Sequence, residues 1–262
     1  MASGAQRLQP SGPWVHQQSA HQEEHRHRRL PPARRQHPAR HHGTPARRHR
    51  QDQSGRVRKH TAAQWLDLDA ARRHCEAGAS IWPWASTYEG EDPEVILACA
   101  GGIPTVETLA AAALLRRDLP DARIRVVNIV DLCVLTPPDR HPHGMADAGF
   151  RELFGTDTPV VFDFHGYPSA VHQLLHGRPE PERFHVRGYV EEGSTTTPYD
   201  LLARNGVSRH DLVISALGHL HGRATVTGDL AAAHARHRDR LREEIRRTGT
   251  DPTEITEWKW QR

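Results

Sequence analysis

Short apolar runs separated by longer segments of helical spacing characterise the chain from about residue 59 onward. Four of the runs are rich in Val, Ile and Phe and too short for helices, which predicts buried β-strands. They cover residues 94–100, 123–130, 159–164 and 184–190. Gly101-Gly102 follows the first run and Pro120 precedes the second, so each strand is bounded by residues that favour turns.

Helices are predicted between and after these strands. Residues 105–119 place Ala and Leu at helical spacing and end in basic residues before a proline. Further helices are predicted over 67–78, 147–154, 169–175, 198–203, 209–217 and 229–247. The alternation predicts an α/β domain whose mainly parallel sheet is flanked by helices. We expect the highly charged helix at 229–247 to lie on the surface with ion pairs inside it, and Trp258 and Trp260 to fold back onto the domain.

The first 55 residues follow no helical or strand period. Residues 1–50 hold ten arginines against two glutamates, a local balance of +8, whereas the other 212 residues carry −5. We expect a disordered basic arm over 1–58 and a folded domain over 59–262. The alternatives are an arm that grips nucleic acid phosphates, weak metal binding by its histidines, and a GC-rich gene segment read out of frame.

Several classes of protein are excluded by what the chain lacks. It has no apolar run of eighteen residues and no apolar leader, so we expect neither a membrane span nor a secretory signal. Cys75, Cys99 and Cys133 are widely spaced and odd in number, which predicts free thiols in a reducing cytoplasm.

Candidate chemistry gathers after the third and fourth predicted strands. His165 and Tyr167 follow the third, where an acid/base pair would suit a ligand at the carboxyl end of a sheet. The alternative is that His165 bonds the backbone and Tyr167 packs under a loop. Ser194, Thr195 and Thr196 precede a predicted helix and would bind an anion or a partner, or else form only a cap and turn.

Two other motifs are less specific. The segment at 100–104 resembles a phosphate-binding turn but lacks both a P-loop lysine and a full dinucleotide motif. His141 and His143 would supply half of a metal site, although a plain loop explains them equally. From the residues alone we therefore predict no metal site and find no complete catalytic set.

Taken in order, the segments resemble one family. QWLDLDAA, EVILACAGGIPTVETLAAAALLR, IRVVNIVDL, LFGTDTPVVFDFHGY, HVRGYVEEGSTTTPYD and ITEWKW are similar to the C-terminal domain of phosphoketolases, from about residue 59 to the end. The resemblance implies a transketolase-like fold. It also implies an aldehyde-lyase of carbohydrate metabolism that uses thiamine diphosphate and Mg²⁺ to convert xylulose 5-phosphate or fructose 6-phosphate, with phosphate, into acetyl phosphate.

The resemblance also sets expectations for partners and sites. Its cofactor binds between two upstream domains that this chain does not contain, so we expect the chain alone to be inactive and to bind no cofactor. Lys59 matches a family lysine that binds the sugar phosphate, although its neighbours differ and an exposed lysine on the arm is the alternative. Expected partners are the missing domains or a homodimer mate. A stand-alone module for separately encoded subunits and a basic-arm nucleic-acid binder are the alternatives, although nucleic acid is not the expected partner.

Overall fold

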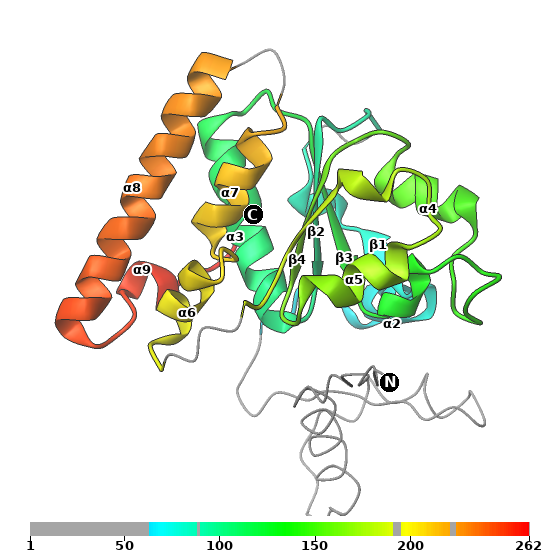
Figure 1. Ribbon diagram of the computed structural model, residues 1–262, viewed down its shortest axis with the longest axis horizontal. Helices are drawn as coiled ribbons and strands as arrows, with labels where there is room; N and C mark the ends of the chain where they lie inside the picture. The colour runs from blue at the N-terminus through cyan, green and yellow to red at the C-terminus, as the bar shows by residue number, and fades with distance from the viewer. Residues whose placement is uncertain (1–62, 88–89, 191–194, 221–223, 262) are drawn as a thin grey trace, which may run out of the picture. The chain divides into compact units, whose positions relative to one another are not determined.

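The computed structural model describes residues 63–87, 90–190, 195–220 and 224–261. Their strands form one sheet in the order β1-β3-β2-β4-β5 (Figure 1). The strands are β1 (Ala79–Ile81), β2 (Val95–Ala100), β3 (Ile124–Ile129), β4 (Val160–Phe164) and β5 (Phe184–Arg187). Only β1 runs antiparallel to its neighbour. The predicted α/β class with a mainly parallel sheet is confirmed.

Strand β2 is the centre of the sheet, and all six of its residues are buried. Its residue Cys99 lies opposite Asn128 of β3 and Asp163 of β4, so three polar side chains meet near the ends of the central strands. Successive side chains on a strand point to opposite faces. Leu97 therefore joins the hydrophobic layer on one face of the sheet and Ile96 the layer on the other.

The helices account for most of the remaining described residues. They are α2 (Leu68–Ala77), α3 (Gly102–Asp118), α4 (Asp147–Phe154), α5 (Pro168–Leu175), α6 (Pro198–Arg204), α7 (Arg209–Leu217), α8 (Ala224–Thr248) and α9 (Thr253–Thr256). Asp67, Thr197 and Ser208 cap α2, α6 and α7 by accepting a backbone N–H bond near each helix start. In the described part of the chain, no helix combines the length and apolar character needed to cross a membrane.

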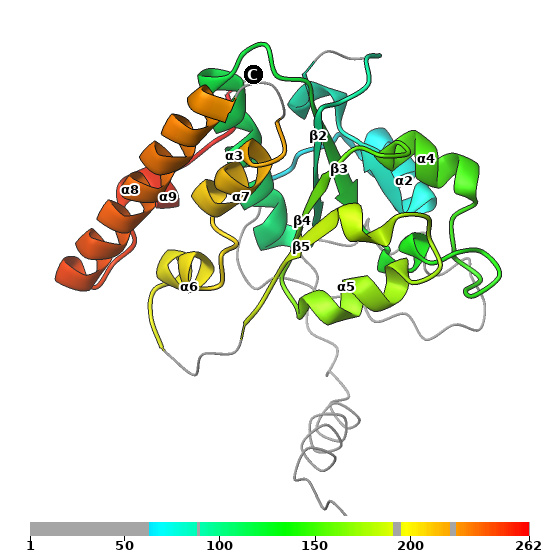
Figure 2. The same cartoon turned by 45° about the horizontal axis from the view of Figure 1, so that its top comes forward.

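Helices cover both faces of the sheet (Figure 2). Helices α3 and α7 pack on one face through side chains such as Leu109 and Leu212, with α8 outside them. On the other face, α4 and α5 bury Phe150, Phe154 and Val171 against the strands. The sheet is thus enclosed between two apolar layers, as is usual for a parallel sheet.

Tryptophans close the layer formed by α3 and α7. The ring of Trp84 stacks on Trp82 at 5.2 Å between centroids and meets Trp260 edge-on at 5.2 Å. Trp65, near the first described residue, stacks on the same ring at 6.3 Å. Trp258 packs against this layer as well. The expected return of the C-terminal tryptophans to the domain is confirmed.

The elements differ from the predictions in several places. Helix α8 begins at Ala224 rather than 229, α3 begins at Gly102 rather than 105, and α9 was not predicted. The short edge strand β1 was not predicted; it follows directly after Gly78, which adopts a left-handed φ of 78° and ends α2. Strand β5 stops at Arg187 rather than 190. Beyond it, the Tyr189 N–H donates to the Gly166 carbonyl and the Val190 N–H donates to Asn205, so the backbone leaves the sheet for loop partners.

The prediction that the charged helix uses ion pairs within itself was incomplete. Such a pair exists between Arg246 and Glu243. The partly buried side chains of α8, however, pair with other elements. Arg238 bonds Asp211 of α7 at 2.6 Å, and Arg242 bonds Asp200 of α6 at 2.9 Å. The helix is therefore fastened to its neighbours by charge as well as by packing.

Candidate functional site at the carboxyl end of the sheet

The connections after β2 and β4 leave the sheet in opposite directions. Strand β2 leads into α3 on one face, and β4 leads into α5 on the other (Figure 2). The two strands are neighbours, so their ends form the topological switch point at which open α/β sheets usually bind ligands. Gly101 stands on one side of this point and His165 on the other.

Gly101 and His165 are in direct contact. Gly101 has a φ of 110°, a conformation that favours glycine, and a Cβ there would lie 2.6 Å from Nδ1 of His165. The same ring nitrogen is 3.3 Å from the Ala100 carbonyl, and the ring lies 4.8 Å from that of Phe164. His165 therefore supports the backbone turn after β2, which corresponds to the structural alternative considered from the sequence.

Tyr167 points to a different neighbour. Its ring is half exposed and meets that of Tyr189 at 5.6 Å, edge to face. The loops that carry these two tyrosines approach each other so closely that a Cβ on Gly188 would clash with the Gly166 carbonyl. His165 and Tyr167 thus share one loop, while the ring of His165 contacts the turn at Ala100 and Gly101 and the ring of Tyr167 meets Tyr189.

A buried chain of polar side chains lies beneath the turn after β2. Ser80 and Asn128 contact the two nitrogens of the His74 ring at 2.7 and 2.8 Å. The Asn128 amide also donates to the Thr105 hydroxyl at 2.9 Å, and that hydroxyl donates to the Gly101 carbonyl at 2.7 Å. Burial lowers the pKa of His74, partly offset by the Asn128 bond, so the neutral ring is favoured. The chain holds the Gly101 turn in place.

Burial favours the neutral forms of two groups beside this chain. Burial raises the pKa of the Cys99 thiol to about 11, so it does not provide a thiolate at neutral pH. Burial, and then the nearby charge of Glu107, raise the pKa of Asp163 well above its ordinary value. Neither carboxyl oxygen of Asp163 finds a hydrogen-bond donor in good geometry within the described part of the chain, although the Phe164 amide opposes the shift slightly.

An ion pair fixes α3 to α7 next to Asp163. The Glu107 carboxylate accepts bonds from the Arg209 side chain at 2.7 and 3.1 Å and from its backbone N–H at 2.7 Å. Both side chains are almost fully buried. Because each oxygen of Glu107 is occupied by Arg209, the pair serves to join the helices rather than to react.

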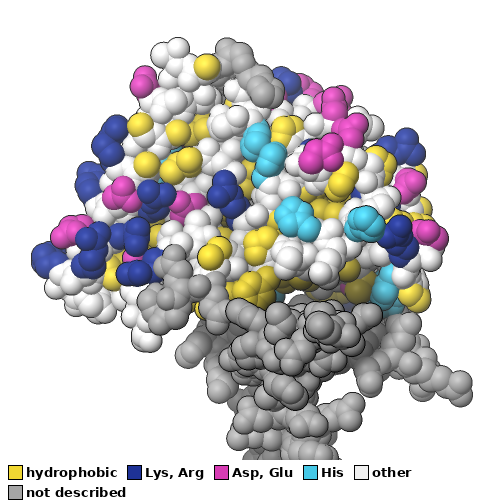
Figure 3. Space-filling view, viewed as in Figure 1, with side chains coloured by type: hydrophobic (Ala, Val, Ile, Leu, Met, Phe, Trp, Pro, Cys, Tyr) yellow, Lys and Arg dark blue, Asp and Glu magenta, His cyan; other side chains and the backbone are white. Residues whose placement is uncertain are grey.

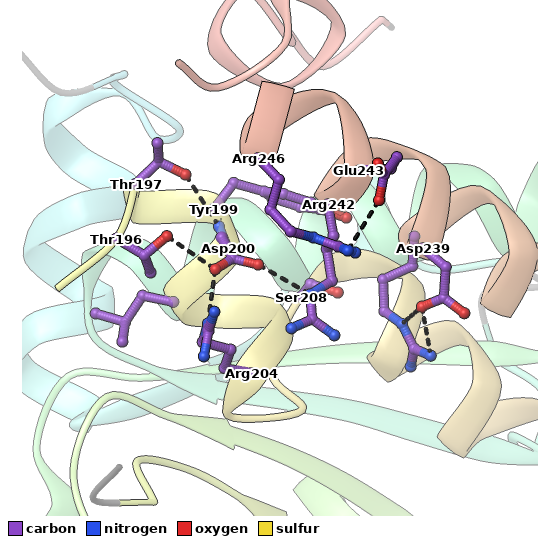
Figure 4. A network of polar contacts seen from close by, with 12 residues as sticks. Thr196, Thr197, Tyr199, Asp200, Arg204, Ser208, Asp239, Arg242, Glu243 and Arg246 are labelled. Atoms are coloured by element: carbon purple, nitrogen blue, oxygen red, sulfur yellow. Dashed lines mark hydrogen bonds and ion pairs between the residues drawn. The ribbon is translucent and has the colours of Figure 1, made fainter. Parts of the chain in front are cut away.

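The hydroxyls at the start of α6 are also engaged (Figure 4). Thr197 caps the helix through the Asp200 N–H, and the Thr196 hydroxyl donates to the Asp200 carboxylate at 2.8 Å. Bonds from Arg204, Arg242 and Thr196 outweigh burial and lower the pKa of that carboxyl to about 2. Thr195 is exposed. Ser194 and Lys59, like the predicted arm at 1–58, lie outside the described residues.

The described residues do not fit the metal and cofactor that the family resemblance implies. Among them, no group of three or more His, Cys, Asp or Glu side chains could hold a metal ion. The His143 ring contacts Asp131 at 2.7 Å, and the His143 backbone N–H donates to the His141 ring, which fits a structured loop. All three cysteines are free thiols. We therefore derive no reaction step through Mg²⁺ or thiamine diphosphate.

Sequence reasoning missed the polar side chains that shape this end of the sheet. Asn128 and Asp163 interrupt the apolar runs RVVNIV and PVVFDF, and Glu107 interrupts an Ala/Leu-rich helix. A polar residue inside an apolar run must be bonded or neutralised when it is buried. That signal was available, although the partners of each residue follow only from the fold.

Comparison with known proteins identifies the family. The model of the XFP C-terminal domain matches residues 59–260. The probable phosphoketolase of Rhodopseudomonas palustris strain HaA2 is 51% identical over 201 residues, and that of Brucella abortus strain 2308 is 45% identical over 202. The chain belongs to the phosphoketolase family.

The match covers one part of these proteins. The match to the Rhodopseudomonas protein covers 76% of this chain and 25% of that protein. The match to the Brucella protein covers 77% of this chain and 26% of that protein. The chain thus spans about a quarter of the length of the phosphoketolases it matches. Among solved structures, transketolase from Leishmania mexicana aligns with a TM-score of 0.41 and 16% identity, over 56% of this chain and 18% of that one.

Proposed function

We propose that the chain is the C-terminal domain of a phosphoketolase and acts in carbohydrate metabolism as part of an aldehyde-lyase. In this proposal the complete enzyme uses thiamine diphosphate and Mg²⁺ to convert xylulose 5-phosphate or fructose 6-phosphate, with phosphate, into acetyl phosphate. The observation that carries it is the family match over residues 59–260. We place the protein in the cytoplasm, where the free thiols would persist.

The polar groups at the carboxyl end of the sheet support a structural role for this domain. His165 and Thr105 are both bonded to backbone carbonyls, and Cys99 is held as the neutral thiol. The proposal therefore assigns cofactor binding and catalysis to the part of the family that this chain does not match. The proposal keeps the boundary between the arm and the domain at residues 58–59. It also assigns Lys59 to contact with the sugar phosphate, and Ser194, Thr195 and Thr196 to an interface.

Complementation tests this proposal. The tagged chain is co-expressed with the Rhodopseudomonas palustris phosphoketolase from which the matched 201 residues have been removed. We expect acetyl phosphate from xylulose 5-phosphate, phosphate, thiamine diphosphate and Mg²⁺ only when both polypeptides are present. Acetyl phosphate formed by the purified chain alone would refute the assignment of catalysis to the unmatched part, and a folded, inactive complex would refute the proposed role in the enzyme.

A further inference from the structure

Four large apolar side chains are exposed at the carboxyl end of the sheet. Val130, Ile103, Tyr167 and Val190 are each about half exposed. They follow β3, β2, β4 and β5 respectively, each within three residues of the strand end. Since these strands are adjacent in that order and about 4.8 Å apart, the four strand ends span about 15 Å along this edge of the sheet. We call this set the carboxyl-end row.

The row accounts for most of the large apolar exposure in the described part of the chain, where Leu68, Leu201 and Val226 are the only others. Single exposed apolar residues are common on protein surfaces, whereas a contiguous group marks an interaction site. In the space-filling view, Lys and Arg side chains gather over α8, while hydrophobic and histidine side chains occupy the middle of the face (Figure 3).

The backbone that carries the row is fixed by its own hydrogen bonds. The Val130 N–H donates to the Gly78 carbonyl at 2.9 Å, and the Val190 N–H donates to the Asn205 side chain. The Tyr189 N–H joins the loops after β4 and β5, and the Thr105 hydroxyl holds the turn before Ile103. A surface that is already ordered loses little conformational entropy when a partner binds.

We propose that the carboxyl-end row is the docking surface for the polypeptide that corresponds to the upstream three quarters of a phosphoketolase. This inference rests on the proposed function. The matched relatives carry that additional length, and the family model places residues 59–260 at the C-terminal end, so the additional chain precedes the domain. A row of three aliphatic side chains and a tyrosine suits an apolar protein surface rather than a charged ligand.

The co-expressed pair described above tests the surface directly. The edge variant carries Ile103→Ser and Tyr167→Ser, and the control variant carries Leu68→Ser and Val226→Ser, which are also exposed but belong to α2 and α8. The upstream polypeptide that co-purifies with the tagged chain is quantified, and the dissociation constant of each complex is measured. We expect the edge variant to bind at least tenfold more weakly than the wild type and the control variant to stay within twofold.

The outcomes separate this inference from the proposed function. Equal binding by the edge and control variants, with acetyl phosphate still produced, overturns the docking surface and leaves the function standing. Edge-dependent binding without acetyl phosphate supports the surface and overturns the function. Absence of binding by the wild type overturns the inference. The inference is also overturned if the chain alone self-associates and the edge variant abolishes that association, because a second copy of the chain would then occupy the row. Unchanged melting temperatures establish that both variants fold.

Discussion

The substitution Asp163→Asn is expected to stabilise the fold at neutral pH. The carboxyl group of Asp163 is 2% exposed and lies near the charge of Glu107, and both conditions raise its pKa well above the ordinary value. In the unfolded chain the group titrates near pH 3.9 and is ionised at pH 7. The folded protein therefore holds this proton up to a higher pH than the unfolded protein does.

The size of the effect follows from this difference. Because the pKa of the Asp163 carboxyl is raised in the folded protein, this carboxyl destabilises the fold increasingly as the pH rises above about 3.9, whereas below that pH it carries no such cost. Each pH unit between the unfolded and the folded pKa costs about 1.4 kcal/mol, so the cost at pH 7 has an upper limit of about 4 kcal/mol. Asparagine has nearly the same shape and no charge. We expect Asp163→Asn to raise the free energy of unfolding at pH 7, by no more than about 4 kcal/mol, with little change near pH 4.

Urea denaturation at several pH values between 4.5 and 7.5 measures this gain, with tryptophan fluorescence as the probe. The rings of Trp65, Trp82 and Trp84 are stacked in the core layer and would report its loss. Asp157→Asn, at an exposed position, is the matched control and should change little. A gain that is the same at every pH, or a loss of stability at pH 7.5, would show that Asp163 is not held neutral.

Two further predictions concern charge in the interior. Glu107→Gln leaves Arg209 charged and buried, so we expect it to lower the free energy of unfolding in urea titrations by about 3–5 kcal/mol. Adding Arg209→Met should recover most of this loss, and no recovery would contradict the pairing. Burial lowers the pKa of His210 to about 3 and also lowers that of His234, so both rings take up protons when the protein unfolds below about pH 6.5. The free energy of unfolding should therefore fall as the pH drops below about 6.5, by up to about 1.4 kcal/mol per pH unit for each ring. Denaturation of the Asp163→Asn variant at pH 7 and pH 5 checks this, and equal stability at both would refute it.

The sequence predicted the sheet well because burial on both faces leaves a direct pattern. The runs that became β2, β3 and β4 are mostly apolar, and their ends were placed within one residue. Strand β1 has only three residues after the left-handed Gly78, too few to show any alternation. Its pairing with β3 is a tertiary contact that local periodicity does not contain.

The candidate site was predicted less completely because its geometry depends on residues distant in sequence. His165 was found from its place after a strand, but its role comes from Gly101 and Ala100, which precede it by more than sixty residues. The chain from His74 to Thr105 joins α2, β3 and α3, so no local spacing reveals it. Likewise, the charge pattern of α8 does not show that Arg238 pairs with α7.

The arrangement of polar groups favours a fixed surface over a reactive one at the carboxyl end of the sheet. A catalytic site keeps donors and acceptors aimed at the position of a substrate. Here the hydroxyl of Thr105 bonds the turn beneath the row, and Asp163 is buried rather than directed outward. These bonds hold the backbone before Ile103 in one conformation while its side chain faces solvent. Substitutions in the buried chain should therefore weaken docking through the position of the turn, whereas substitutions in the row should weaken it by direct loss of contact.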